Sequence, residues 1–145
     1  MNRLPISLLA TLAAVLSLLG LYLREELWGV GPISIGLQVV AGLLMAWARL
    51  TFGSRSFHAA AAPTTGALVA HGPYAFVRNP IYAAVILFTS SGVAVHFGLV
   101  SALLGLVVTA AMLVRILAEE RELAAAYPEY PAYARRVKRL VPWIF

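Results

Sequence analysis

Residues 79–114 read NPIYAAVILFTSSGVAVHFGLVSALLGLVVTAAMLV, a run of 36 residues without a formally charged side chain. As a single α-helix, at 1.5 Å per residue, this run would be about 54 Å long, well beyond the roughly 30 Å of a bilayer's hydrocarbon core. The run therefore has to fold back on itself. The turn is predicted at residues 96–98 (HFG), which leaves a short membrane span over residues 81–95 and a second span over residues 99–117.

The composition of the whole chain agrees with a membrane location. Of its 145 residues, 61% are hydrophobic and 12% are charged, and the mean hydropathy is +0.86. Soluble domains carry about 45–50% apolar and roughly 25% charged residues, so the composition excludes a water-soluble globule, a disordered chain and a fibrous repeat. The length fits one domain over residues 1–145. The absence of cysteine excludes disulfides, a thiolate nucleophile and a cysteine-bound metal.

Two more apolar stretches precede the long run. Residues 4–23 have the length of a membrane span, and residues 30–48 form another, with Pro32 near its start. The first stretch is longer than the apolar region of a signal peptide and lacks a clear cleavage site, so we expect it to be retained. Gln38 is expected to face other helices rather than lipid. The sequence thus predicts an all-α integral membrane protein with about four transmembrane helices.

The remaining segment, residues 118–145, is predicted to be a short amphipathic tail. Apolar side chains recur in it at intervals of three to seven residues between Leu123 and Leu140. Pro128 and Pro131 are predicted to break it into two short helices. The basic run at residues 135–139 (RRVKR) is expected to contact anionic lipid headgroups.

The distribution of charge predicts the orientation. With four spans, ten of the eleven basic residues lie on the side of both termini, and Arg24 alone lies on the other side. Cytoplasmic segments of membrane proteins carry the excess of Lys and Arg. We therefore expect a multi-pass protein of the cell membrane with both termini in the cytoplasm. This bias also explains the net charge of +5, so no nucleic-acid partner is expected.

Two polar clusters fall on the predicted cytoplasmic side. The first, residues 71–82 (HGPYAFVRNPIY), leads into the third span, and the second, residues 115–123 (RILAEEREL), leaves the fourth. A three-residue turn joins these two spans at their far ends, so the clusters should face one another at the membrane surface. No grouping of His, Asp and Glu has the spacing of a metal site, so no metal is expected.

Adjacent Glu119 and Glu120 stand where the fourth helix leaves the bilayer, a costly position for two carboxylates without partners. With Arg78 opposite and Arg115 one turn away, they would form a compact site that carries both signs of charge. Such a site suits a zwitterionic or cationic ligand. A simpler interpretation stays open, in which Arg78 and Asn79 are an interfacial anchor and a helix cap. Arg115 and Glu119 would then be an ordinary i,i+4 pair.

The two clusters together resemble the isoprenylcysteine carboxyl methyltransferase and phospholipid methyltransferase superfamily of small integral membrane enzymes. Its first motif, approximately Gly-Pro-Tyr-x-x-x-Arg-His/Asn-Pro-x-Tyr, matches residues 72–82. Its second motif is an arginine one turn before a Glu-Glu pair, then a leucine, a tyrosine-rich stretch and a basic run ending in proline. Those places are occupied here by Arg115, Glu119, Glu120, Leu123, Tyr127, Tyr130, Tyr133, Arg135 and Pro142. The resemblance covers roughly residues 47–142 and is closest to a minimal bacterial form.

Three positions depart from the family pattern. Asn79 stands where many members have histidine, and Ala84 stands where glycine is frequent. Pro128 replaces the glycine that usually precedes the Glu-x-Tyr stretch. The first two departures would alter the packing around a cofactor, and the third would reshape the tail.

The resemblance implies an enzyme that transfers a methyl group from S-adenosylmethionine to an amphiphilic, membrane-borne acceptor. It implies that Arg78 pairs with the cofactor carboxylate and that Glu119 or Glu120 pairs with its ammonium. Tyr74 and Tyr82 would offer π faces to the sulfonium or the adenine. The implied cofactor-binding residues are His71, Gly72, Tyr74, Arg78, Asn79, Tyr82, Glu119 and Glu120. The implied catalytic residues are Arg115 and Glu119.

The acceptor stays open between two branches of the superfamily. Arg115 would bind a carboxylate, as in the isoprenylcysteine branch, whereas an amine, as in the phospholipid branch, would call for a nearby carboxylate. The presence of Arg115 favours the anionic acceptor. Two other classes of function also remain: an NADPH-dependent membrane reductase of the sterol-reductase type, whose tail is related, and a non-enzymatic membrane scaffold.

Overall fold

A computed structural model describes residues 4–53 and 67–145 of the chain. The described residues form five α-helices and one 3-10 helix: α1 (Leu4–Leu23), α2 (Gly31–Phe52), η2 (Gly72–Ala75), α3 (Pro80–His96), α4 (Leu99–Ala126) and α5 (Tyr130–Arg136). Helices α1, α2 and α4 are long and apolar enough to cross a membrane, and α3 is a shorter apolar helix. The predicted all-α, multi-pass membrane fold is therefore confirmed.

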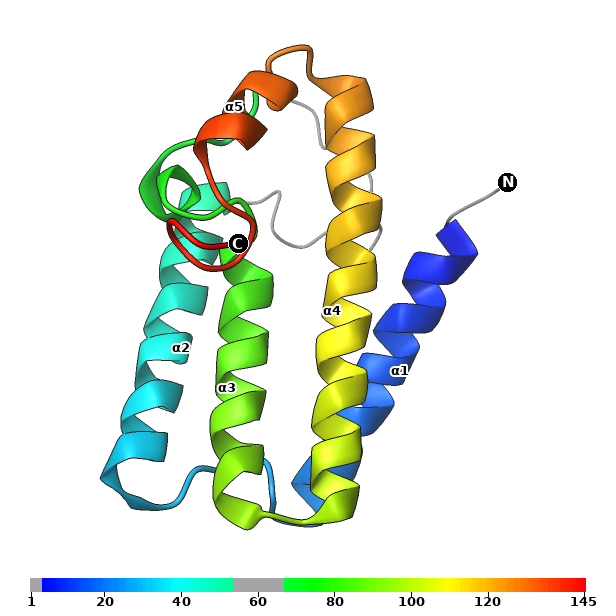
Figure 1. Cartoon of the computed structure of the whole chain (residues 1–145), viewed down its shortest axis with the longest axis vertical. Coiled ribbons are helices and arrows are strands. Elements are labelled where there is room, and N and C mark those ends of the chain that lie inside the picture. Colours follow the sequence, from blue (N-terminus) through cyan, green and yellow to red (C-terminus); the bar gives the residue numbers. More distant parts are fainter. Residues whose placement is uncertain (1–3, 54–66) are drawn as a thin grey trace.

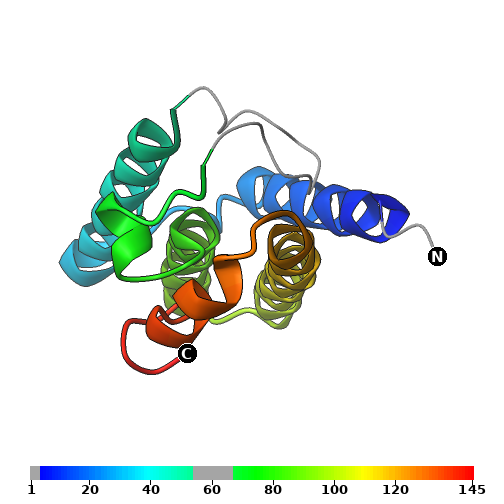
Figure 2. The same ribbon diagram turned by 90° about the horizontal axis from the view of Figure 1, so that it is seen from above.

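The long helices pack as a bundle in which α2, α3 and α4 stand side by side (Figure 1). Helix α1 crosses α4 obliquely. It lies on one side of α4 and the short helix α5 lies on the opposite side, as the view from above shows (Figure 2). It packs chiefly against α4, while α2 packs chiefly against α3. The core between α1 and α4 is built on Ala14, Val108, Ala111 and Met112, and the two small alanines, one from each helix, allow a close approach.

The reversal predicted within the long uncharged run is confirmed. Helix α3 ends at His96 and α4 begins at Leu99, so that only two residues make the turn. Phe97 in this turn has a left-handed backbone conformation, with φ of 46°. The two helices therefore run antiparallel, and the start of α3 and the end of α4 meet at the same end of the bundle (Figure 1).

The fourth helix is longer than expected, and the prediction of two short tail helices is wrong. Residues 118–126 continue α4 without a break, and α5 alone forms a separate helix in the tail. The physical reason lies in the composition of this segment, which consists of Leu, Ala, Glu and Arg, all good helix formers. The first helix-breaking residue in this segment is Pro128, which follows the end of α4.

The opposite end of the bundle is closed by buried polar contacts of Gln38 in α2. The Nε2 of Gln38 donates to the carbonyl oxygens of Leu27, at 2.9 Å, and of Phe88, at 3.2 Å. Its Oε1 accepts from the backbone N–H of Gly29 at 2.9 Å. Gln38 thus faces other protein segments, as predicted, and ties the α1–α2 connection to α3.

Gly92 of α3 lies against this connection. A Cβ atom there would be 2.1 Å from the carbonyl oxygen of Leu27 and 3.2 Å from Nε2 of Gln38. We predict that Gly92→Ala lowers the thermal unfolding midpoint in detergent by several degrees, because overpacking costs about 1–3 kcal/mol. The control is Gly42→Ala in α2, where a new Cβ meets no atom within 4 Å. That variant should keep or raise the midpoint, and equal midpoints for both variants would contradict the close approach.

Candidate active site

The first polar cluster is packed against the end of α2. Gly72 has a φ of +59°, and a Cβ there would lie 2.7 Å from Oγ1 of Thr51. Its backbone conformation and this close approach both favour glycine. Tyr74 is buried beside Phe52, with ring centroids 5.6 Å apart. These contacts fix the loop that carries Arg78 and Asn79 at the start of α3.

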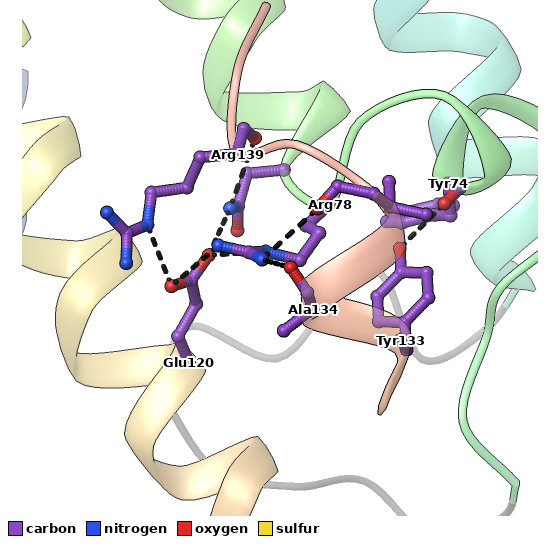
Figure 3. Close-up of polar contacts among 8 residues, drawn as sticks. Tyr74, Arg78, Glu120, Tyr133, Ala134 and Arg139 are labelled. Carbon is purple, nitrogen blue, oxygen red and sulfur yellow. Dashed lines mark hydrogen bonds and ion pairs between the residues drawn. The ribbon is translucent and has the colours of Figure 1, made fainter. Parts of the chain in front are cut away.

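Glu120 of α4 accepts hydrogen bonds from three side chains (Figure 3). Its Oε1 accepts from Nε of Arg78 and from Nδ2 of Asn79, each at 3.0 Å. Its Oε2 accepts from Nε of Arg139 at 2.9 Å. The side chain is only 10% exposed. Two guanidinium groups and an amide thus compensate a carboxylate that would be costly at this depth without partners.

Arg78 also holds the tail. Its Nη1 donates to the carbonyl oxygens of Ala134, at 2.5 Å, and of Val137, at 3.1 Å, at the C-terminal end of α5 (Figure 3). Carbonyls at a helix C-terminus lack partners within the helix and favour such a cation. The backbone N–H of Arg78 donates to the carbonyl of Lys138 at 2.7 Å. Arg78 therefore joins α4, the loop before α3 and the tail.

Asn79 belongs to the same group. It occupies the N-cap position of α3, but its side chain makes no capping hydrogen bond. Besides Glu120, its Nδ2 bonds to the carbonyl of Arg139 at 3.3 Å. The simpler interpretation of Asn79 as a helix cap is therefore wrong, because its amide is directed toward α4 and the tail.

A second hydrogen bond fixes α5 to the loop. The hydroxyl of Tyr133 donates to the carbonyl oxygen of Tyr74 at 2.6 Å (Figure 3). Burial raises the pKa of Tyr133 to about 12. The hydroxyl therefore stays protonated, and the bond persists across the physiological pH range.

Glu119 makes different contacts. Its Oε1 accepts hydrogen bonds from Nη2 of Arg115, at 3.1 Å, and from the hydroxyl of Tyr82. The Nε of Arg115 donates to the same hydroxyl at 3.0 Å, and its Nη1 donates to Thr11 of α1. Arg115 is 8% exposed, whereas the side chain of Glu119 is 27% exposed. This group therefore connects α1, α3 and α4 and keeps one carboxylate partly open.

Adjacent residues of an α-helix lie about 100° apart around its axis, and this separates the two glutamates. Glu120 faces Arg78 and the tail, and two arginines compensate its charge. Glu119 faces Arg115, and its carboxylate is the more accessible of the two. Of these two carboxylates, Glu119 is therefore the one that can accept a further cationic partner.

The structure divides the residues predicted for the site into three places. Arg78, Asn79 and Glu120 form one buried group, and Tyr82, Arg115 and Glu119 form another. The remaining residues, His71, Gly72 and Tyr74, lie on the loop beside α2, where His71 is exposed and Tyr74 is buried. The expectation that the two clusters face one another is confirmed.

Two contributors were missed by the sequence analysis. Arg139 was expected on lipid headgroups with the rest of the basic run, but its Nε pairs with Glu120, so that prediction is wrong for this residue. Thr11 lies 104 positions before Arg115, and a single threonine in an apolar span carries no signal of its role. The place of Arg139 between the tyrosine-rich stretch and Pro142 could have marked it as part of the second motif.

A bundle of apolar helices with a buried polar site of both signs of charge at one end defines a small integral membrane protein. Residues 34–125 match the model of the isoprenylcysteine carboxyl methyltransferase family. No curated protein and no solved structure matches the chain. Because the family match covers more than half of its length, the chain belongs to this family and is an S-adenosylmethionine-dependent membrane methyltransferase. The reductase and scaffold alternatives are set aside by this membership.

The two buried polar groups at this end of the bundle, together called the polar centre below, fit the cofactor of the family. S-adenosylmethionine carries a carboxylate and an ammonium, and the site offers groups of both signs. The hydroxyl of Tyr130 is buried and has no hydrogen-bond partner among the described residues. Because buried polar groups are almost always bonded, this hydroxyl is suited to a polar ligand.

We predict that Glu120→Gln lowers the thermal midpoint and makes the tail susceptible to proteolysis. The substitution leaves Arg78 and Arg139 without their carboxylate, and breaking a buried pair costs about 3–5 kcal/mol. Glu122→Gln is the matched control, because Glu122 lies on the same helix but is exposed. Limited proteolysis and thermal unfolding in detergent measure both effects. If both variants behave like the wild type, Glu120 does not hold the tail.

Proposed function

We propose that the protein methylates the carboxylate of a lipid-borne, isoprenylcysteine-like acceptor, and that Arg115 binds this carboxylate. The supporting observation is the position of Arg115, which is 8% exposed on a membrane-crossing helix and contacts residues of α1 and α3. A guanidinium at this depth is costly. Here the guanidinium is paired with Glu119 and hydrogen-bonded to Tyr82 and Thr11, and an anionic group that reaches the site from the lipid would be a further partner for it.

The acid–base groups near the site also favour a carboxylate. Carboxylic acids have pKa values near 4 and are ionised at neutral pH, whereas amines have values near 10 and must first lose a proton. Of the two histidines that the structure describes, His71 is exposed on the loop, and His96 contacts Trp28 at the opposite end of the bundle. Neither histidine is placed to deprotonate an amine at Arg115. Glu119, 3.1 Å from Arg115, would have to serve an amine acceptor as the base, whereas a carboxylate acceptor needs none.

The proposed cofactor contacts follow the two groups of the site. Glu119 binds the ammonium, since it is the more accessible carboxylate. Tyr130 and the loop that carries Arg78 bind the carboxylate, although Arg78 also has its structural partners. When bound, S-adenosylmethionine supplies an electrophilic methyl group and departs as a neutral thioether. The residues of the chain therefore have to align two ligands and exclude water, with no demand for an acid or a base.

A phospholipid amine is the second candidate acceptor. It is favoured by one observation, the 27% exposure of the Glu119 side chain, which is able to attract an ammonium group. In that case Glu119 serves the acceptor, and Arg115 holds Glu119 in place through their 3.1 Å contact. The two candidates differ in the product that they form, an ester or a methylated amine.

The test offers the purified protein, in lipid nanodiscs, a labelled cofactor and three amphiphiles. These are N-acetyl-S-farnesylcysteine, its carboxamide and phosphatidylethanolamine. We predict that only the first is methylated and that its label is released by alkali, as an ester requires. Arg115→Gln should lower turnover at least about 100-fold, or about 2.7 kcal/mol, with the cofactor Kd within about threefold of wild type.

Arg121→Gln is the matched control for this test, because Arg121 lies on the same helix and is exposed. It should leave turnover near that of the wild type. Alkali-stable label in phosphatidylethanolamine would instead support the amine acceptor. A parallel fall of cofactor affinity and turnover in Arg115→Gln would mean that Arg115 only supports Glu119.

We also propose that the polar centre lies on the cytoplasmic side. Arg49, Arg78 and the basic residues of α5 belong to one end of the bundle, whereas Arg24 follows α1 at the other (Figure 1). This asymmetry agrees with the excess of basic residues in cytoplasmic segments. Reporter fusions after Phe145 should be active in the cytoplasm, and a fusion at Gly29 should be active outside. A periplasmic signal from the first fusion would contradict the orientation.

A further inference from the structure

The tail carries an exposed apolar surface that lies outside the polar centre. Residues 140–145, here called the tail loop, follow α5 and include Val141, Trp143 and Ile144, which are 45%, 87% and 77% exposed. In Figures 1 and 2 the tail loop, in red, projects from the bundle near the start of α3, on the side away from α1. These side chains lie outside the predicted spans, so a position on a membrane-crossing helix does not explain their exposure.

The tail loop is closed by its own backbone hydrogen bonds. The N–H groups of Leu140 and Val141 donate to the backbone oxygen of Phe145 at 2.6 and 2.7 Å, and the N–H of Phe145 donates to the carbonyl oxygen of Val141 at 3.1 Å. Within the loop, Trp143 has a φ of 65°. A bulky residue is strained in this left-handed region. The loop thus holds a large aromatic side chain outward at a conformational cost.

The depth of the tail loop is set by its attachment to α3. The backbone N–H groups of Arg78 and Asn79 donate to the carbonyls of Lys138 and Arg139, at 2.7 and 3.1 Å. Arg78 and Asn79 directly precede Pro80, the first residue of α3. The tail loop therefore begins at the level where an apolar helix enters the membrane.

Positive charge borders the same surface. Arg135, Arg136 and Lys138 are exposed on α5 and directly after it. Exposed Trp and aliphatic side chains next to Lys and Arg are typical of segments that lie in the membrane interface. If a second copy of this chain covered this surface about a two-fold axis, it would bring these three cations against their own copies, which is unfavourable.

We propose that the tail loop is an interfacial anchor that inserts Trp143 and Ile144 beneath anionic lipid headgroups, which bind Arg135, Arg136 and Lys138. The anchor is connected to the polar centre through Arg139. The Nε of Arg139 bonds to Glu120, and its guanidinium lies 5.5 Å from the centre of the Phe145 ring. Arg139 therefore contacts both the tail loop and Glu120 of the polar centre.

The test uses the absence of cysteine from the chain. Ile144→Cys, labelled with a polarity-sensitive fluorophore, is reconstituted in nanodiscs of phosphatidylcholine with phosphatidylglycerol. The expected result is blue-shifted emission that nitroxide-labelled lipids quench and aqueous iodide does not. Glu122→Cys, labelled in the same way, is the control and should respond to iodide alone, because Glu122 is exposed and lies beyond the predicted span.

A second arm tests the charges. Removing all three, as Arg135→Gln, Arg136→Gln and Lys138→Gln together, should at least double iodide quenching at position 144 in anionic nanodiscs, since each basic residue near such a surface strengthens its attraction to the membrane. The charge substitutions should have no such effect in pure phosphatidylcholine. Iodide quenching of the position-144 probe equal to that of the control would overturn the proposal. Protection that disappears at one protein per nanodisc would also overturn it, because a second copy would then cover the loop.

Discussion

The buried carboxylate of Glu120 is the constraint on which the arrangement of this protein's polar end depends. It lies on the last membrane-crossing helix, and its partners come from the loop before α3 and from the tail. One ionised side chain at this depth is unfavourable without compensation, so the partners have to be present together. The three segments therefore fold around one charge, although they are far apart in the sequence.

This arrangement assigns the two adjacent glutamates to different tasks. Because Arg78 and Arg139 compensate Glu120, that carboxylate belongs to the framework of the site. Glu119 stays partly exposed beside Arg115 and Tyr82, and Arg115 reaches Thr11 on α1. Helix α1 lies before the segment that matches the family, yet it contributes a contact to the group that we assign to the acceptor. The site is thus built by the whole bundle.

Sequence patterns predicted the spans, the turn after His96 and the approach of the two polar clusters, because each depends on local composition and on the length of a helix. The sequence patterns did not predict the length of α4, because its charged, amphipathic end resembles a separate tail helix. Residues 118–126, before Pro128, are all good helix formers, and they continue α4 without a break. Nor did the sequence patterns predict that Arg139 turns inward whereas Arg135 and Arg136 stay exposed. Which basic residue turns inward depends on the register of the tail against Arg78 and Asn79, and this register is a tertiary contact.

We assign Glu119 to the cofactor and Glu120 to the framework of the site, and cofactor binding by Glu119→Gln tests this assignment. The measurement is calorimetric titration of S-adenosylhomocysteine into the purified variant, with the thermal midpoint of the ligand-free protein recorded alongside. We expect an affinity at least about tenfold weaker than that of the wild type, or about 1.4 kcal/mol, with the midpoint unchanged within a few degrees. Wild-type affinity, or a loss of affinity accompanied by a collapse of the midpoint, would contradict it.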